Sequence, residues 1–115
     1  MLIRSQDKVF LLNFNNLTAI YMEKIDKDFA IVYNDFEDAY TLGKYSTEAK
    51  AMKVLDMIQE AYANAELISM IVPNIGKMFT EAPESKENEL LAEAIGEVLM
   101  NKMVFQMPED GSVEV

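Results

Sequence analysis

The sequence contains no cysteine and no histidine. Without cysteine the chain has no disulfide framework and no thiol nucleophile, so we expect a cytoplasmic protein. The usual zinc, copper and haem ligand sets, which rely on these two residue types, are excluded. The Ser-His-Asp and Cys-His arrangements of nucleophilic catalysis are excluded with them. Because no spacing of carboxylates or lysines singles out a catalytic pair, we predict a protein that is not an enzyme and uses no metal or cofactor.

Long hydrophobic runs are also missing. No stretch approaches the ~18 consecutive apolar residues of a membrane span. Residues 1–7 turn polar at once and lack the apolar run of a secretion signal. These patterns predict that the protein has no membrane partner.

Basic residues are few. Ten lysines and arginines face twenty acidic residues, which gives a net charge of −10, and Arg4 is the only arginine. This balance argues against a nucleic-acid partner, because sequence-independent DNA binding needs a basic surface that displaces counterions. Two interpretations stay open. The charge either keeps the surface soluble, or it mimics nucleic acid and covers a basic site on another protein.

The length of 115 residues, half of them hydrophobic, fits one domain with one core over residues 1–115. Residues 1–45 carry alternating apolar patterns that are broken by turn residues, which is typical of short β-strands. Their short connections predict an antiparallel β-meander with one face free to meet a helix. The predicted strands cover residues 2–4, 9–12, 17–22, 29–33 and 39–45, with a hairpin loop at residues 23–28 and turns at residues 13–16 and 34–38.

A long amphipathic helix is predicted over residues 46–72. Ser46 is the expected N-cap, Glu48 suits the positive end of the helix, and Pro73 is expected to end it. Apolar residues recur at spacings of three and four along this segment, which gives one broad stripe. At ~1.5 Å per residue such a helix spans ~37 Å, more than one small sheet needs. The surplus end must therefore pack against the rest of the chain or against a second copy.

The remaining residues predict a loop, a second helix, a strand and a tail. Residues 73–84 form the loop, and Ser85 caps a helix over residues 85–102. A final strand within residues 103–108 could pair back onto the meander, and residues 109–115 are expected to fray. The predicted fold is therefore a single α+β domain, in which an antiparallel meander of about five strands, with a C-terminal strand, packs on two long α-helices.

Nine methionines could indicate either an adaptable binding surface or plain core. Their helical spacing favours core. The C-terminal half nevertheless holds more apolar surface than a lone helix pair hides, so we predict a homo-oligomer, a dimer or larger.

A ligand site is predicted where the meander meets the first helix, because free N–H groups and the helix dipole attract an anion there. Residues 43–47 at this junction supply a cation and two hydroxyl groups, although the carboxylate of Glu48 would repel a phosphate. Arginine suits phosphate recognition and tyrosine can stack on a base, although surface exposure and core packing are the ordinary alternatives. Acidic residues between positions 26 and 38 lack a calcium-loop pattern, which favours solvated turns. The predicted ligand-binding residues are Arg4, Tyr40, Lys44, Tyr45, Ser46 and Thr47.

Four stretches together resemble a group of small phage and prophage proteins of Firmicutes. In that group a β-meander leads into a helix with a Lys-Val-Leu-Asp-Met-Ile run, and the chain ends on a Phe-Gln-Met-Pro strand. The resemblance covers roughly residues 1–62 and 102–115, so residues 63–101 are expected to be an enlarged connection that carries the second helix. The stretches are residues 2–8 (Leu-Ile-Arg-Ser-Gln-Asp-Lys), 42–51 (Leu-Gly-Lys-Tyr-Ser-Thr-Glu-Ala-Lys-Ala), 53–58 (Lys-Val-Leu-Asp-Met-Ile) and 104–108 (Val-Phe-Gln-Met-Pro).

The overall plan is also similar to that of the Thoeris anti-defence sponge proteins of phages, which are non-enzymatic oligomers. Those proteins sequester a cyclic ADP-ribose signal, so the host NADase effector is never activated. No ligand residue of that family can be matched to a position here, and the single arginine counts against a pyrophosphate ligand.

These resemblances imply a phage-type anti-defence protein that binds and sequesters a cyclic nucleotide signal of the cyclic ADP-ribose class in the host cytoplasm. Its site would be a pocket between subunits, polar at the junction of meander and helix and walled by tyrosines. The alternative is an acidic protein–protein interaction module, or a phage accessory protein, that covers a basic nucleic-acid-binding surface.

Overall fold

The computed structural model describes residues 1–81 and 86–115. The predicted cap at Ser85 and residues 82–84 of the predicted loop lie outside the described residues. In chain order the elements are β1 (Leu2–Arg4), β2 (Leu11–Asn13), the 3-10 helix η1 (Phe14–Asn16), β3 (Ala19–Ile25), β4 (Asp28–Asn34), β5 (Ala39–Tyr45), α1 (Glu48–Glu81), α2 (Lys86–Lys102), β6 (Val104–Gln106) and the 3-10 helix η2 (Asp110–Ser112).

The six strands form two three-stranded sheets, in the orders β2-β1-β6 and β3-β4-β5. The predicted α+β class is confirmed, and so is the pairing of the last strand with the N-terminal strands. β6 pairs with β1 in parallel, whereas the other pairings are antiparallel. The chain changes sheets at the predicted turn of residues 13–16, where the Asn13 side chain accepts a 2.9 Å hydrogen bond from the Asn15 N–H and starts η1.

The hairpin between β3 and β4 is tighter than predicted. β3 continues to Ile25, which pairs with Asp28, so the predicted loop over residues 23–28 is wrong. Only Asp26 and Lys27 connect the strands, and Asp26 has a φ of 54°. Aspartate tolerates this left-handed conformation better than most residues do, which allows the short connection despite the lack of glycine.

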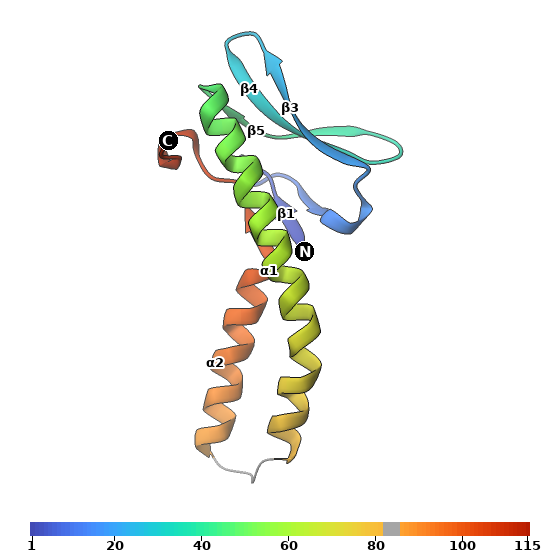
Figure 1. The fold of residues 1–115 in the computed structure, drawn as a ribbon, viewed down its shortest axis with the longest axis vertical. Helices are drawn as coiled ribbons and strands as arrows, with labels where there is room; N and C mark the ends of the chain where they lie inside the picture. Colours follow the sequence, from blue (N-terminus) through green and yellow to red (C-terminus); the bar gives the residue numbers. More distant parts are fainter. Residues whose placement is uncertain (82–85) are drawn as a thin grey trace.

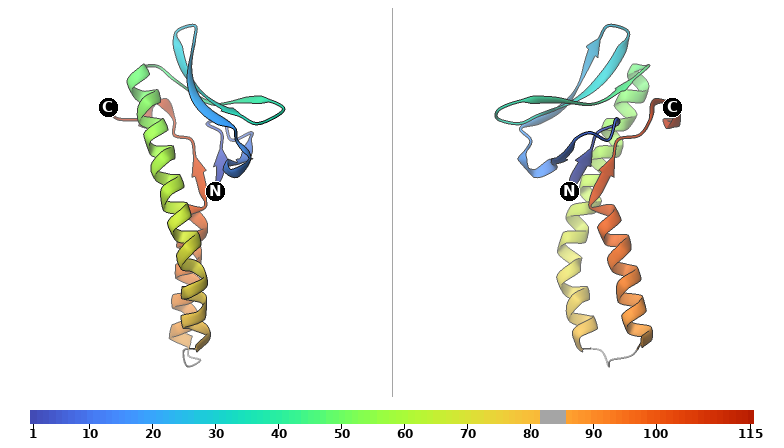
Figure 2. Two further views of the ribbon diagram at one scale, coloured as in Figure 1. Left: turned by 45° about the vertical axis from the view of Figure 1, so that its right-hand side comes forward. Right: turned by 180° about the vertical axis from the view of Figure 1, so that it is seen from behind.

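The core lies between the sheets and the first half of α1 (Figures 1 and 2). The predicted apolar stripe of this helix is confirmed there, since Ala51, Val54, Ile58 and Ala65 are buried. The Tyr33 hydroxyl joins the two sheets by donating a 2.6 Å hydrogen bond to the Asn13 carbonyl. Truncating a buried aliphatic side chain such as Ile58 to alanine would cost about 2–5 kcal/mol.

The first helix does not end at Pro73. α1 has 34 residues and contains Pro73 in its interior, so the prediction of an end near residue 72 is wrong. An interior proline removes one backbone hydrogen bond and costs about 3 kcal/mol. α1 nevertheless continues through Pro73 and contacts α2. The proline is a local signal, and in this chain it does not end the helix.

The second half of α1 and the whole of α2 project away from the sheets as a helical hairpin (Figures 1 and 2), which gives the molecule extents of 60 × 32 × 22 Å. Within the residues that the structure describes, neither helix has an apolar stretch long enough to cross a membrane. The second helix expected within residues 63–101 is α2 of this hairpin.

Candidate functional site

The N-terminus of α1 is capped by Thr47 rather than by the predicted Ser46. The Thr47 side-chain oxygen accepts a 3.2 Å hydrogen bond from the Lys50 N–H, and its carbonyl accepts one from the Ala51 N–H. This is the N-cap arrangement, in which a side chain satisfies a backbone donor of the first turn. Ser46 stands one residue earlier and has a different partner.

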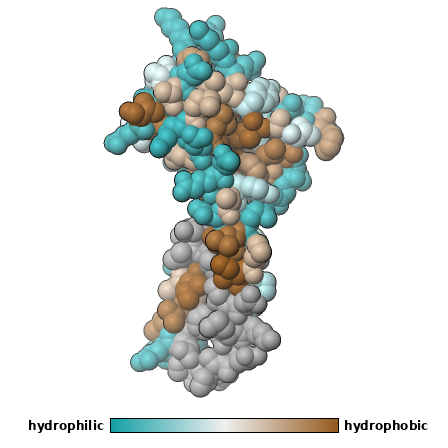
Figure 3. All heavy atoms as spheres, viewed as in Figure 1, coloured by the Kyte–Doolittle hydropathy of each residue, from teal (hydrophilic) through white to brown (hydrophobic). Residues whose placement is uncertain are grey.

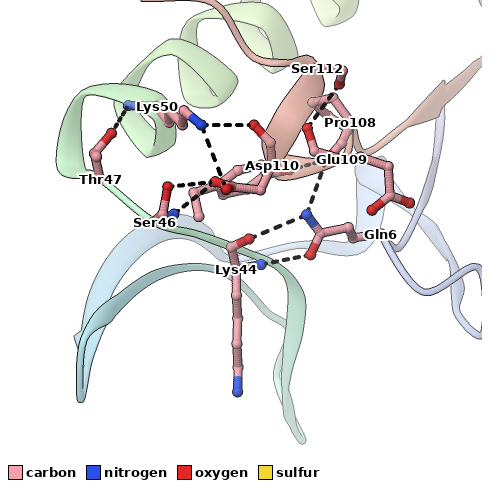
Figure 4. A network of polar contacts seen from close by, with 10 residues as sticks. Gln6, Lys44, Ser46, Thr47, Lys50, Pro108, Glu109, Asp110 and Ser112 are labelled. Atoms are coloured by element: carbon pink, nitrogen blue, oxygen red, sulfur yellow. Dashed lines mark hydrogen bonds and ion pairs between the residues drawn. The ribbon is translucent and has the colours of Figure 1, made fainter.

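That partner is the carboxylate of Asp110, far along the chain (Figure 4). Its Oδ1 accepts hydrogen bonds from the Ser46 backbone N–H at 2.8 Å and from the Ser46 hydroxyl at 3.1 Å. The Lys50 ammonium lies 3.6 Å from Oδ2 and donates to the Asp110 carbonyl at 3.1 Å. The Ser46 backbone bond is the main cause that lowers the pKa of Asp110, and Lys50 adds to it.

Asp110 therefore fills the anion position that the sequence predicts for a ligand. A phosphate at this junction would have to displace a carboxylate of the same chain. The prediction that residues 109–115 fray is also wrong, because η2 forms there and Val113 is buried. Burial of Met107 and Val113 holds this segment against the core.

Gln6 holds the same segment from the other side (Figure 4). Its amide oxygen accepts from the Lys44 N–H at 3.0 Å, and its amide nitrogen donates to the carbonyls of Lys44 and Pro108 at 3.2 Å each. A Cβ at Gly43 would lie 3.3 Å from the Cβ of Gln6, so the close approach requires little bulk there. The Lys44 side chain extends away from this network.

Tyr45 and Arg4 do not join a ligand pocket. Tyr45 is fully buried and donates a 2.8 Å hydrogen bond to the Pro108 carbonyl. Burial, and then the charges of Glu109 and Asp110, raise its pKa, so it is a core residue with a satisfied hydroxyl. The Arg4 guanidinium donates to the Lys8 carbonyl at 3.4 Å on the exposed turn between β1 and β2.

Two of the six predicted residues line one open cavity. Tyr40 and Lys44 lie on β5 beside the turn between β1 and β2, around a cavity of about 430 Å³. The rings of Phe10 and Tyr40 meet edge to face with centroids 5.5 Å apart. Asp7 and Gln6 complete the polar side of this cavity. Sequence reasoning missed Gln6, Asp7 and Phe10, because the contact between their turn and β5 is formed only in the tertiary fold.

The turn between β4 and β5 carries a second feature that sequence reasoning missed. Residues 35–38, called the acidic turn below, hold three carboxylates and Phe36, whose side chain is 93% exposed. Asp35 shapes the turn from within, since its Oδ1 accepts from the Glu37 and Asp38 N–H groups at 2.8 and 2.7 Å. These two bonds lower the pKa of Asp35 and keep it ionised.

The carboxylates of the acidic turn act on their neighbours. Partial burial, and then the charges of Asp38, Asp35 and Glu37, raise the pKa of Tyr40. Burial and Asp35 raise the pKa of Tyr33 in the same way. The field around the acidic turn is therefore negative as far as the cavity at Tyr40, which favours a cationic partner over an anionic one.

The hard-cation site considered between positions 26 and 38 has no structural counterpart among the described residues, where no group of three or more acidic side chains is placed to hold a metal ion.

Comparisons of the chain with protein-family models, with curated proteins and with solved structures gave no match.

Proposed function

We propose that this protein is a non-enzymatic protein–protein interaction module, which covers a basic, nucleic-acid-binding surface of another protein with its acidic turn. The observation that carries the proposal is Phe36, a large aromatic side chain that is 93% exposed on a turn with three carboxylates. In the phage setting that the resemblance implies, the protein would be an accessory or anti-defence factor in the host cytoplasm.

An exposed phenylalanine in a hydrogen-bonded turn has the properties of an interface anchor. Aromatic side chains provide much of the energy of protein interfaces, and burying one fully contributes about 1.5–3 kcal/mol. The turn is already shaped by the Asp35 hydrogen bonds and by the 3.0 Å bond from the Asp35 N–H to the Asp38 carbonyl. Less conformational entropy is therefore lost when a partner binds.

The surroundings of Phe36 define the chemistry of the partner. Carboxylates on both sides of the ring complement lysine and arginine side chains and steer a basic surface toward it. A depression of about 380 Å³ beside the ring is lined by residues 35–37 of the acidic turn and by residues 15–18, of which Leu17 is apolar and the others are polar. Together with the net charge of −10, this arrangement supports a partner that has an apolar pocket within a basic surface.

Affinity capture with a matched pair of variants tests the proposal. Phe36→Ser removes the anchor, and Val9→Ser removes another exposed apolar residue, 73% exposed, from a different turn. Capture from a lysate of a Firmicutes host should retain a nucleic-acid-binding protein on the wild type and on Val9→Ser, and lose it on Phe36→Ser and above about 0.5 M salt. Equal retention by all three proteins would contradict the proposal.

The cavity at Tyr40 favours a second candidate, the sequestration of a cyclic nucleotide of the cyclic ADP-ribose class. Its volume of about 430 Å³ lies in the range of small-molecule sites, and Phe10 and Tyr40 offer aromatic surface beside the Lys44 backbone and the Gln6 amide. The negative field of the acidic turn and the occupied junction at Asp110 weigh against an anionic ligand, which places this candidate second.

A thermal-shift assay separates the second candidate from the first. Cyclic ADP-ribose isomers should raise the melting temperature of the wild type, and heating the complex should release the ligand unmodified. Tyr40→Ala should abolish the shift, while Tyr21→Ala, on β3 and 39% exposed, should retain it. The absence of a shift across a panel of cyclic nucleotides would eliminate sequestration and leave the interaction module.

A further inference from the structure

The helical hairpin carries apolar side chains that the chain itself does not cover. On α1 they follow Ala65, at spacings of three and four residues, and on α2 they lie in the second turn. Figure 3 shows brown side chains on α1 directly below the sheets and on α2 farther from them, toward the start of that helix. The exposed side chains are Leu67 (55%), Met70 (72%), Ile71 (41%), Leu90 (57%) and Leu91 (53%).

Acidic residues border this surface. Glu89, Glu93 and Glu97 recur every four residues along α2, on a line beside Leu90. All three are exposed. This arrangement is an apolar stripe with a charged edge, as on helices that associate through one face while their edge stays in water.

The sheets support only the first half of α1. Its buried residues end at Ala65. Beyond that point, no residue of α1 or α2 whose side chain the structure describes is buried. Helices of this length are marginal in water without tertiary packing, and two helices alone do not enclose a core. The hairpin therefore needs a partner that is present whenever the chain is folded.

We infer that this partner is a second copy of the chain, whose hairpin packs on the first to form a four-helix bundle with two-fold symmetry. A second copy is the one partner always present with the chain, and a two-fold axis brings the same stripe of both copies together. Four helices enclose the core that two cannot, and the glutamates stay at the solvated edge.

The size of the surface limits how much of each copy the dimer can bury. Residues 66–81 of α1 and the 17 residues of α2 form two helical segments of similar length. If half of each segment faces the partner, roughly 16 residues per copy take part, against about 20–30 per side in standard interfaces. A small interface with an acidic edge gives a dimer that dissociates in the micromolar range.

The dimer is distinct from the partner contact proposed at the acidic turn. In Figure 1 the turn projects to the right of the sheets and the hairpin extends below them, so one dimer presents two acidic turns. Failure of the dimer would leave the proposed function standing, because Phe36 is not part of the hairpin surface.

Sedimentation equilibrium with two matched variants tests the inference. Met70→Glu and Met52→Glu make the same change in the same helix, and only Met70 lies on the hairpin surface. The wild type and Met52→Glu should form dimers with micromolar dissociation constants, and Met70→Glu should weaken the dimer at least tenfold. A wild type that stays monomeric at about 100 μM, or a Met70→Glu dimer of unchanged strength, overturns the inference.

A labelling experiment keeps the test valid if Met70→Glu fails to fold. Because the chain has no cysteine, Glu93→Cys and Lys27→Cys each give a single site for a spin label. Packed helices lie about 8–10 Å apart, so labels at position 93 should be within roughly 30 Å of each other between copies. Labels at position 27, in the β3–β4 turn, should be farther apart. The inference is overturned if spin labels at position 93 show no dipolar coupling between copies, or if labels at position 27 lie closer together than labels at position 93.

Discussion

At the scale of single residues, Asp110 determines the chemistry of the junction between β5 and α1. The sequence predicts that this helix N-terminus attracts an anion, and in the structure Ser46 and Lys50 both bind a carboxylate there. The anion belongs to the chain itself, 64 residues from Ser46. Local patterns identify the donors of such a site, but they do not reveal which distant carboxylate arrives.

Asp110→Asn tests this contact through its pH dependence. The folded pKa of Asp110 is lowered, so the contact stabilises the protein above the unfolded pKa of ~3.9 and is lost as the pH falls through the folded value. At pH 7 the variant should melt below the wild type, and the difference should shrink on acidification below pH ~3.9. Thermal melts of both proteins from pH 7 to pH 2 measure this difference in melting temperature. Glu109→Gln is the control. A loss of melting temperature in Asp110→Asn that does not change with pH would contradict the role given to the Asp110 carboxylate.

Thr47→Ala tests which residue caps α1. Loss of an N-cap costs about 1 kcal/mol, which lowers the melting temperature of a domain of this size by roughly 4 °C. Ser46→Ala should cost less, because the backbone bond from Ser46 to Asp110 stays in place. Thermal melts of the two variants at pH 7 distinguish the two caps. A larger loss of melting temperature in Ser46→Ala would show that Ser46 is the N-cap, as the sequence predicted.

At the scale of elements, alternating residues predict strands well where one face of the strand is buried. β3 and, apart from its bulge, β5 follow this rule, whereas β4 is buried on both faces at residues 30–33; the apolar stripe of α1 follows the rule with helical spacing. The pattern does not say which strands pair, so neither the division into two sheets nor the parallel pairing of β1 with β6 follows from it. These depend on how residues 107–113 dock beside α1.

Pro73→Ala tests the continuity of α1. In a continuous helix the proline is a local defect, so alanine should raise the free energy of unfolding by about 1–3 kcal/mol and leave the helical content unchanged. If Pro73 ended the helix, alanine would extend it, and the circular dichroism signal at 222 nm would grow. Urea denaturation and far-ultraviolet spectra distinguish the two outcomes.

At the scale of the whole molecule, the fold separates two surfaces with different chemistry. The sheets present the acidic turn with Phe36, and the hairpin presents the stripe around Met70. One surface suits a basic partner, and the other suits a second copy. In the proposed dimer the acidic turn would be presented twice, which would strengthen binding to a partner with repeated sites.

Of the candidate sites, the sequence predicted some members but not their arrangement. Tyr40 and Lys44 share a cavity, Ser46 and Thr47 serve the helix start, Tyr45 belongs to the core, and Arg4 binds a neighbouring carbonyl. The exposure of Phe36 could not be predicted, because an aromatic residue in a strand-rich segment is more often buried. Its position between acidic residues in a turn is the signal that was available.

Competition for nucleic acid tests the central claim most directly. A protein captured by the wild type is purified, and its affinity for DNA or RNA is measured by fluorescence anisotropy with increasing amounts of wild type, Phe36→Ser or Val9→Ser. Wild type and Val9→Ser should displace the nucleic acid at a one-to-one ratio of chains, and Phe36→Ser should need at least tenfold more, because the anchor contributes about 1.5–3 kcal/mol. Nucleic acid that stays bound with the wild type in excess, or that Phe36→Ser displaces equally well, would contradict the account.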